Sequence, residues 1–245
     1  MHCKIIKLFV IAGALSALGA GSLLAQNVLT GWDLLETQVG TTFDGAPFVG
    51  VPLGTYNFGG TIGVQNVGNT DTIIQRLSTV TAPSGTTPLQ MDALQLESAT
   101  PVSLGGGPLG FYFITLQSAD GTGPASTGAM TINFSPNTFS SSLDVFFDVH
   151  FGALNGPIVL QSNLALSNPG TPWGNVPPPG AITINGVNQN LNGNNNLSDF
   201  WPNGSFSETE AGTTHVVADA TPEPATMALA GLSGLGLLLF RRQRK

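Results

Sequence analysis

Apolar and polar residues alternate along several short stretches of the chain. The clearest stretch is Ser140–Phe151, in which every second residue from Leu143 to Phe151 is apolar. Because the side chains of a strand point alternately to its two faces, this pattern predicts a strand with one buried face. Gly110–Gln117 carries apolar residues on both faces, which indicates a central strand.

Glycine and proline divide the middle of the chain into further short apolar stretches. The other expected strands are Thr55–Val67, Thr72–Thr81, Gln90–Glu97, Ala129–Phe134, Ile158–Leu166, Ala181–Val187 and Thr213–Ala218. Trp32–Thr37 is expected to form a helical turn, and Asp92–Glu97 to form either a strand or a helix. About nine short strands separated by turn residues predict an all-β fold, an antiparallel β-sandwich or jelly-roll-like body.

The first residues of the chain have a different pattern. Two lysines precede the apolar residues 8–20, and small residues follow them. A basic region, an apolar region and small residues in this order are typical of a secretory signal peptide. Residues 1–25 are therefore expected to form a signal peptide that is cleaved after Ser22 or Ala25. A retained anchor helix is the alternative.

The last residues contain a second apolar segment. Pro222-Glu223-Pro224 is followed by the apolar stretch Met227–Phe240 and then by a basic tail. The residues of that tail that would stop translocation are Arg241, Arg242, Arg244 and Lys245. We expect a short transmembrane helix, with its basic tail in the cytoplasm and the body exported. A plain tail anchor is the alternative.

Nearly all of the basic residues lie at the two ends. Of the seven Lys and Arg residues, Arg76 alone lies between the terminal segments. From Gln26 to Thr221, thirteen acidic residues and this one basic residue give a net charge of −12. Because phosphate binding needs clustered cations, this charge excludes nucleic acid as a partner. The single cysteine, Cys3, excludes a disulfide framework and a cysteine-based zinc site.

The chain is expected to have four segments. These are the signal peptide at 1–25, one β-rich extracytoplasmic domain at 26–207, a spacer at 208–221 and the C-terminal segment at 222–245. Within the domain, the proline-rich stretch Ser167–Gly180 is expected to be a stiff extended connector. The part after this connector is too small and too polar to bury its own core, which favours a single domain.

Three features of the C-terminus occur together and in a fixed order. They are the Pro222-Glu223-Pro224 triplet, a short helix rich in Gly, Leu and Ala, and an arginine-rich end. In a chain with a signal peptide, this combination resembles the PEP-CTERM sorting domain of exported proteins of Gram-negative bacteria. The resemblance implies that an exosortase, a membrane-embedded transpeptidase-like protease, recognises Pro222, Glu223 and Pro224 and cuts near them. Proteins of this kind typically occur in bacteria that make exopolysaccharide and biofilm matrix.

The body offers few candidates for chemistry. Trp173 and Trp201, flanked by Pro and Gly, are the candidates for stacking on sugar rings. Asp148 and His150 would share one strand face, as an Asp–His pair that could orient a general base or bind a metal. A solvent-facing strand is the preferred interpretation. No Gly-x-Ser-x-Gly elbow accompanies the pair, so no catalytic residue is predicted.

Two further arrangements have weak support. Glu208 and Glu210 would share a face of an extended chain, but they lie in the expected spacer. Asn188–Gly193 with Asp199 has the spacing of a calcium loop, yet its leading ligands are neutral amides, so an Asn-rich turn is preferred. His215 has no expected role. We predict neither a cofactor nor a metal site.

These features favour a non-enzymatic exported protein that an exosortase sorts to the cell surface or into the extracellular matrix. The expected partners are the exosortase and, transiently, the inner membrane, with exopolysaccharide as a further candidate. A carbohydrate-binding module is the alternative function. A secreted hydrolase that uses Asp148 and His150 is a third hypothesis.

Overall fold

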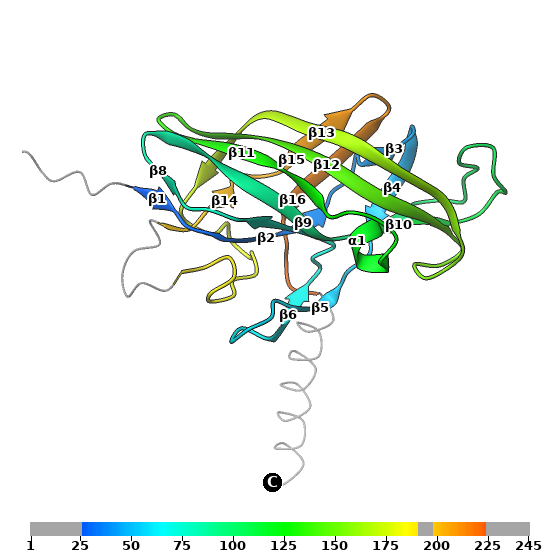
Figure 1. The fold of residues 1–245 in the computed structure, drawn as a ribbon, viewed down its shortest axis with the longest axis horizontal. Coiled ribbons are helices and arrows are strands. Elements are labelled where there is room, and N and C mark those ends of the chain that lie inside the picture. The colour runs from blue at the N-terminus through cyan, green and yellow to red at the C-terminus, as the bar shows by residue number, and fades with distance from the viewer. Residues whose placement is uncertain (1–25, 191–197, 224–245) are drawn as a thin grey trace, which may run out of the picture.

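The computed structural model describes residues 26–190 and 198–223, which form one β-rich body (Figure 1). The strands are β1 (Asn27–Val28), β2 (Gly31–Thr37), β3 (Thr42–Phe43), β4 (Ala46–Gly50), β5 (Gly54–Asn57), β6 (Val64–Gly68), β7 (Thr72–Arg76), β8 (Val80–Thr81), β9 (Ser84–Ser98), β10 (Tyr112–Leu116), β11 (Ser126–Phe134), β12 (Asn137–Phe151), β13 (Ile158–Gly174), β14 (Trp201–Pro202), β15 (Phe206–Glu210) and β16 (Thr213–Asp219). The single described helix is the short α1 (Gln117–Asp120).

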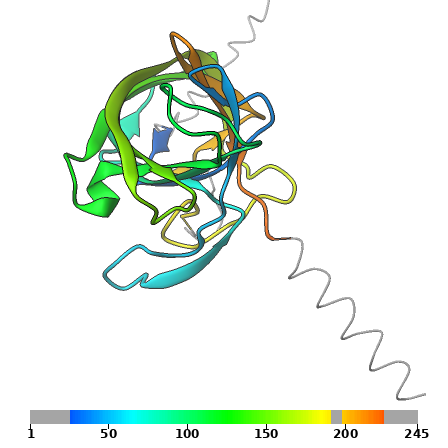
Figure 2. The same ribbon diagram turned by 90° about the vertical axis from the view of Figure 1, so that its right-hand side faces the viewer.

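Hydrogen-bonded strand neighbours form a closed ring. Starting from β9, the order of neighbours is β11, β12, β13, β15, β16, β2, β7 and again β9, and every pairing is antiparallel. Figure 2 looks into this ring from the end near β3, β4 and β10. The prediction of an all-β, antiparallel body is confirmed, and its layers are joined edge to edge by hydrogen bonds.

The two ends of the ring are completed by different strands. The long strands β9 and β12 pair with β11 along one half and with β10 along the other half. At the β10 end, β4 and β3 connect β9 to β16. Because edge strands with unpaired backbone groups are thereby reduced, the closed ring protects the body from edge-to-edge association.

The main hydrophobic core fills the inside of the ring. Every second residue of β12 from Leu143 to Val149 is buried, as the alternating pattern predicts. Aromatic rings cross the interior, for example Phe43, whose ring meets that of Phe147 edge to face with 5.2 Å between centroids. Burial of apolar surface at about 25 cal/mol per Å² is the main stabilising contribution to such a fold.

A second, smaller core lies on the outside of the ring. Adjacent strand residues point to opposite faces, so Ile74 belongs to the inner core while Ile73 belongs to the outer one. The outer core is covered by the β5–β6 hairpin and by the segment 182–187. Ala220, which follows β16, is also part of it. The chain therefore passes through this outer core as it leaves the last strand (Figure 1).

Several local expectations were wrong. Trp32–Thr37 is not a helical turn but lies in β2. Of the two alternatives for Asp92–Glu97, the strand is confirmed, because this segment is part of β9. Ala181–Val187 forms no regular strand. The proline-rich stretch from Ser167 is not a separate connector up to Gly174, because β13 continues through it and Pro172 lies opposite Thr138 of β12.

The expected spacer at 208–221 is the largest error. Residues up to Glu210 lie in β15, and Thr213–Asp219 form β16, so both belong to the closed ring. β16 pairs with β15, β2 and β3. The ring would open without β16, so the domain extends at least to Asp219 and no free spacer separates it from Pro222.

Candidate functional site

The junction between the body and the Pro-Glu-Pro triplet is held by backbone hydrogen bonds. The Ala220 N–H donates to the Leu34 carbonyl at 2.9 Å, and the Ala220 carbonyl accepts from the Ile182 N–H at 2.9 Å. Ala220 is 1% exposed. The residue two positions before the triplet is thus fixed on both sides, by β2 and by the segment after the proline-rich stretch.

Thr221 is held even more completely. Its N–H and its hydroxyl both donate to Glu36 Oε2, at 3.1 and 2.9 Å. Its carbonyl accepts from the Asn69 N–H at 2.9 Å. Charge-assisted bonds to a carboxylate are the stronger kind of hydrogen bond. We use the name latch for Glu36, Asn69 and Thr221, which together attach the chain immediately before the triplet.

Gly68 makes room for the latch. Its φ of +53° lies in the left-handed region, which favours glycine. A Cβ at this position would lie 2.7 Å from the Thr221 carbonyl oxygen and 2.6 Å from Ile182 Cδ1. The close approach of the chain end to the β5–β6 hairpin therefore requires glycine.

Replacing Gly68 by Ala is expected to lower the free energy of unfolding by about 2 kcal/mol, because the left-handed backbone and the contact with Thr221 both penalise a side chain. The matched control is Gly59→Ala, where φ is +74° and no atom lies within 4 Å of the added Cβ. The control should cost only about 1 kcal/mol. Urea unfolding measures both changes. Equal losses in the two variants would mean that the contact with Thr221 does not contribute.

The triplet begins directly after the latch. Pro222 is exposed, and Glu223 is half-buried beside Gly54, where an added Cβ would lie 3.7 Å from Glu223 Oε1. Pro224 lies outside the described residues, as do Met227–Phe240 and the four basic residues of the tail. Within residues 26–190 and 198–223, no helix is long and apolar enough to cross a membrane. The expected membrane helix falls outside these ranges.

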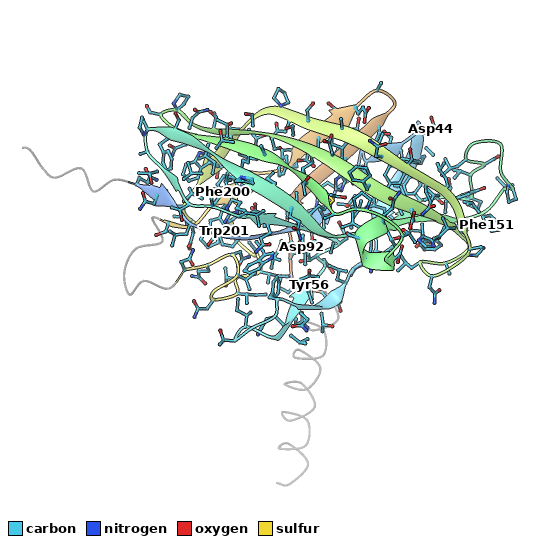
Figure 3. The ribbon with its side chains drawn as sticks, viewed as in Figure 1. Asp44, Tyr56, Asp92, Phe151, Phe200 and Trp201 are labelled. Carbon is cyan, nitrogen blue, oxygen red and sulfur yellow. The ribbon has the colours of Figure 1, made fainter. Side chains whose placement is uncertain are left out.

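The two tryptophans that were candidates for stacking on sugar rings are buried. Trp173 is 1% exposed, donates from Nε1 to the Asn133 carbonyl at 3.0 Å and stacks on Phe200. Trp201 is 2% exposed and lies in β14, opposite Gly174. Figure 3 labels Trp201 and Phe200 at the end of the body where β14 lies. Packing inside the body occupies the ring faces that a sugar would need.

Glu208 and His215 are interior residues, contrary to the expectation that they lie in a solvated spacer. They face each other across β15 and β16 and are 2% and 3% exposed. Burial raises the pKa of Glu208 to about 7, although a hydrogen bond from Ser141 at 3.1 Å opposes this shift. Burial also lowers the pKa of His215 to about 4. Both side chains are therefore neutral in the folded protein at mildly acidic pH.

Asp148 and His150 also differ from the expected solvent-facing strand. They do share one face of β12, but both are buried, whereas Asp144 on that face is exposed. The Asp148 carboxylate accepts from Thr122 Oγ1 and from Gln161 Nε2. The covering element is α1 with the turn that follows it, which the sequence pattern did not predict.

The described part of the Asn-rich segment uses its polar groups for its own backbone. The Asn188 side chain accepts from the Ile184 N–H and donates to the Ile182 carbonyl, both at 2.8 Å. Asp199 Oδ1 accepts from the Asn190 N–H at 2.7 Å. The middle of the segment with calcium-loop spacing, including Asn192 and Gly193, lies outside the described residues. The Asn188 and Asp199 groups seen here shape the turn.

The residues of the latch were not found from the sequence. Glu36 lies 185 positions before its partner Thr221, and the hydroxyl of Thr221 accepts from Asn69, which lies 152 positions before it. Neither residue belongs to a motif. The pairing of β2 with β16 brings Glu36 to the chain end, and Asn69 reaches it from the turn between β6 and β7. No local pattern indicates either role.

The comparisons with known proteins agree with the position of the junction. The model of the PEP-CTERM protein-sorting motif family matches residues 220–245, which begin at the buried Ala220. Comparison with curated proteins and with solved structures found no match. The segment that starts at the latch is thus a PEP-CTERM sorting signal, and the chain is an exosortase-targeted, exported protein with a membrane-anchored precursor.

Proposed function

We propose that this chain is a non-enzymatic protein of the cell surface or extracellular matrix, delivered as a folded body and released from its membrane anchor by an exosortase. In this proposal a signal peptide within residues 1–25 directs export and is removed after Ser22 or Ala25. The apolar stretch Met227–Phe240 then holds the precursor in the membrane, and the basic tail stops translocation. The body folds on the outer side of the membrane.

The observation that carries the proposal is the latch. The residues up to Thr221 are bound to the body, and the sorting motif begins without a spacer. A protease needs an extended, accessible peptide. Pro222 disfavours helix in Thr221 before it and is itself exposed, so such a peptide starts at the triplet. We infer that the cut falls after Thr221 and leaves β16 intact.

The polar interior supports a structural role for the body. Covalent catalysis by Asp148 and His150 would need a side-chain nucleophile in contact with the imidazole. Among the described side chains, the hydroxyl that contacts His150 is that of Thr115, and it donates its proton to Asp120. A hydroxyl committed in this way is not activated by His150. A secreted hydrolase is therefore the weaker proposal.

The surface supports a matrix location. The body between Gln26 and Thr221 has a formal net charge of −12, and five of its thirteen acidic residues are buried. Its single basic residue, Arg76, is buried as well, so the acidic residues that remain at the surface are not balanced by any Lys or Arg of the body. Such a surface repels polyanions and stays soluble at high local concentration. Carbohydrate binding through Trp173 and Trp201 is not favoured, because both rings are buried. An association with neutral exopolysaccharide would have to use the exposed polar side chains.

Replacement of Glu223 by Ala tests the proposal in the source bacterium. We expect the variant to remain in the membrane fraction with its tail attached, because the Pro-Glu-Pro triplet loses its one charged group. The parent protein should be recovered outside the cell without the tail. Asp144→Ala is the matched control, since it removes an exposed carboxylate of β12 instead. It should be processed like the parent. Normal processing of the Glu223 variant would contradict the proposed role of the triplet.

A further inference from the structure

Three potential metal ligands converge at one end of β12. Asp148 and His150 project from the same face of this strand, and Asp120 comes from the last position of α1. One ligand atom from each residue lies within 4.8 Å of the others. Thr115 of β10 adds a hydroxyl, whose oxygen lies 2.8 Å from His150 Nε2. The distances suit ligands that share one ion.

The imidazole of His150 is oriented as in a metal ligand. Its Nδ1 lies 2.9 Å from the carbonyl oxygen of Gly156, which can only accept, so Nδ1 carries the hydrogen. The other nitrogen, Nε2, then faces the cluster. Histidines that bind metals through one nitrogen commonly donate the other N–H to a backbone carbonyl or a carboxylate.

The neighbours of Nε2 present lone pairs to it. Asp120 Oδ2 lies 3.1 Å away, and the single proton of the Thr115 hydroxyl is donated to this same carboxylate oxygen. Two oxygen lone pairs and a nitrogen lone pair would repel one another. A cation bound among these atoms would remove this repulsion, as would one additional proton shared among them.

The charge of the surroundings favours a cation. Asp148 is 0% exposed and accepts only from the neutral groups of Thr122 and Gln161. Among the described residues, the one Lys or Arg is Arg76, which pairs with Asp33 elsewhere. A buried carboxylate without a cationic partner is costly. A divalent ion would neutralise both carboxylates.

An ion can reach the cluster from solvent. The side chain of Asp120 is 31% exposed, whereas His150 and Asp148 lie beneath it. α1 ends at Gly121 in the left-handed conformation, and the turn after it carries Thr122 back to Asp148. In Figure 1, α1 is the short green helix beside β10. Asp120 therefore lies at the solvent-exposed edge of the cluster, and the other two residues lie buried beneath it.

From this geometry we propose that Asp120, Asp148 and His150 bind one divalent transition-metal ion, of the chemistry of Zn²⁺ or Mn²⁺. Imidazole nitrogen with two carboxylates is a donor set that these ions accept. Ca²⁺ prefers six to eight oxygen ligands, and an imidazole does not suit it. The ion would tie α1 to β12 and β10, at the end of the ring where the long strands separate from β11. Its role is structural, and it is independent of sorting.

Calorimetric titration of the full chain in detergent, after dialysis against a chelator, tests the site with Zn²⁺ and Mn²⁺ in turn. We expect one equivalent of at least one of these ions to bind and to raise the melting temperature. Asp120→Asn should weaken binding at least tenfold without lowering the melting temperature of the metal-free protein, because Asp120 is at the solvent-exposed edge. Asp144→Asn, an exposed change on the same strand, should bind like the parent.

Co²⁺ provides a second measurement that does not depend on stability. Bound to the parent chain it should show visible absorption bands of a nitrogen and oxygen site, and His150→Gln should remove them. Absence of binding at one equivalent would overturn the proposal. So would weak binding of several ions that is the same in the parent, Asp120→Asn and Asp144→Asn chains, because that result would indicate diffuse attraction to the acidic surface.

Discussion

Replacement of Arg76 by Met is expected to lower the free energy of unfolding by about 3–5 kcal/mol, a large part of the stability of a typical domain. Arg76 lies in β7 and is 1% exposed. Its guanidinium pairs with the carboxylate of Asp33 and lies 4.9 Å above the ring of Phe200. Met fills much of the same volume, so the loss is due chiefly to the charge.

The loss would be large because the variant leaves the buried Asp33 carboxylate without a cation. Asp33 is 5% exposed, and burial already raises its pKa, a shift that Arg76 opposes. Asp219 lies close to the same pair, and burial together with the charge of Asp33 raises its pKa to about 8. Without Arg76, Asp33 must take up a proton or remain charged in an apolar setting, and each outcome destabilises the fold. Asp219 already holds its proton at neutral pH, so its state changes little.

Urea unfolding monitored by tryptophan fluorescence measures this effect. The informative control is the double variant Arg76→Met with Asp33→Asn, which removes both charges of the pair. It should recover about half of the lost stability or more, because the unpaired charge rather than the missing contact dominates the single variant. If Arg76→Met alone costs less than about 1 kcal/mol, the pair would behave like an exposed salt bridge and its assigned burial would be wrong.

Replacement of Glu208 by Gln is expected to stabilise the protein at pH 8 by about 3 kcal/mol and to have little effect at pH 4.5. Gln keeps the shape and the acceptor that bonds Ser141. It also cannot ionise, whereas the Glu208 carboxyl carries one buried oxygen, Oε2, without a hydrogen-bond partner. The substitution therefore mimics the protonated side chain at every pH.

The direction of this pH dependence follows from the pKa of Glu208 in the folded and in the unfolded chain. The pKa of Glu208 is about 7 in the folded state, against an ordinary value of 4.5 in the unfolded chain. Between these values the folded protein holds a proton that the unfolded chain has released, so unfolding becomes easier as the pH rises. The contribution of this residue to stability is complete below about pH 4.5 and is lost as the pH rises through about 7.

His215, on the neighbouring strand, has the opposite effect. Its pKa of about 4 lies below the ordinary 6.5, so its contribution is present above pH 6.5 and is lost as the pH falls through about 4. Both the parent and the Glu208→Gln chain contain His215, so the contribution of His215 cancels when their free energies of unfolding are subtracted. Chemical denaturation at pH 4.5, 6 and 8 should therefore show a difference that grows with pH. A difference that is constant over this range would contradict the burial of Glu208.

The sequence predicted the class of fold because the ring is built from alternating strands. Ser140–Phe151 and Thr213–Ala218 coincide almost fully with β12 and β16. Strand β15 was missed, and the region after it was assigned to a spacer, because this part of the chain is polar. In Phe206–Glu210 the inward positions include Glu208, and a carboxylate at an inward position looks like a solvated segment. Its partner Ser141 is 67 residues away, beyond any local pattern.

The predictions for the tryptophans and for Trp32–Thr37 were wrong for a related reason. Pro and Gly beside Trp173 indicate a loop. β13 nevertheless extends through Pro172, because it pairs with the long neighbouring strand β12. Trp32–Thr37 carries apolar residues that suit a helix as well as a strand. Pairing with β7 and β16 selects the strand conformation, and both of these strands are distant in sequence. The Pro222-Glu223-Pro224 triplet was recognised because a sorting signal is a contiguous motif.

The intact mass of the protein recovered from outside the cell tests most directly whether a complete body is released at the latch. The mass should correspond to a chain that has lost 22–25 residues at its start and that ends after Thr221 but before the apolar stretch Met227–Phe240. Fragmentation of the C-terminal peptide locates that end. A full-length chain outside the cell, or an end inside β16, would contradict the release of an intact closed ring.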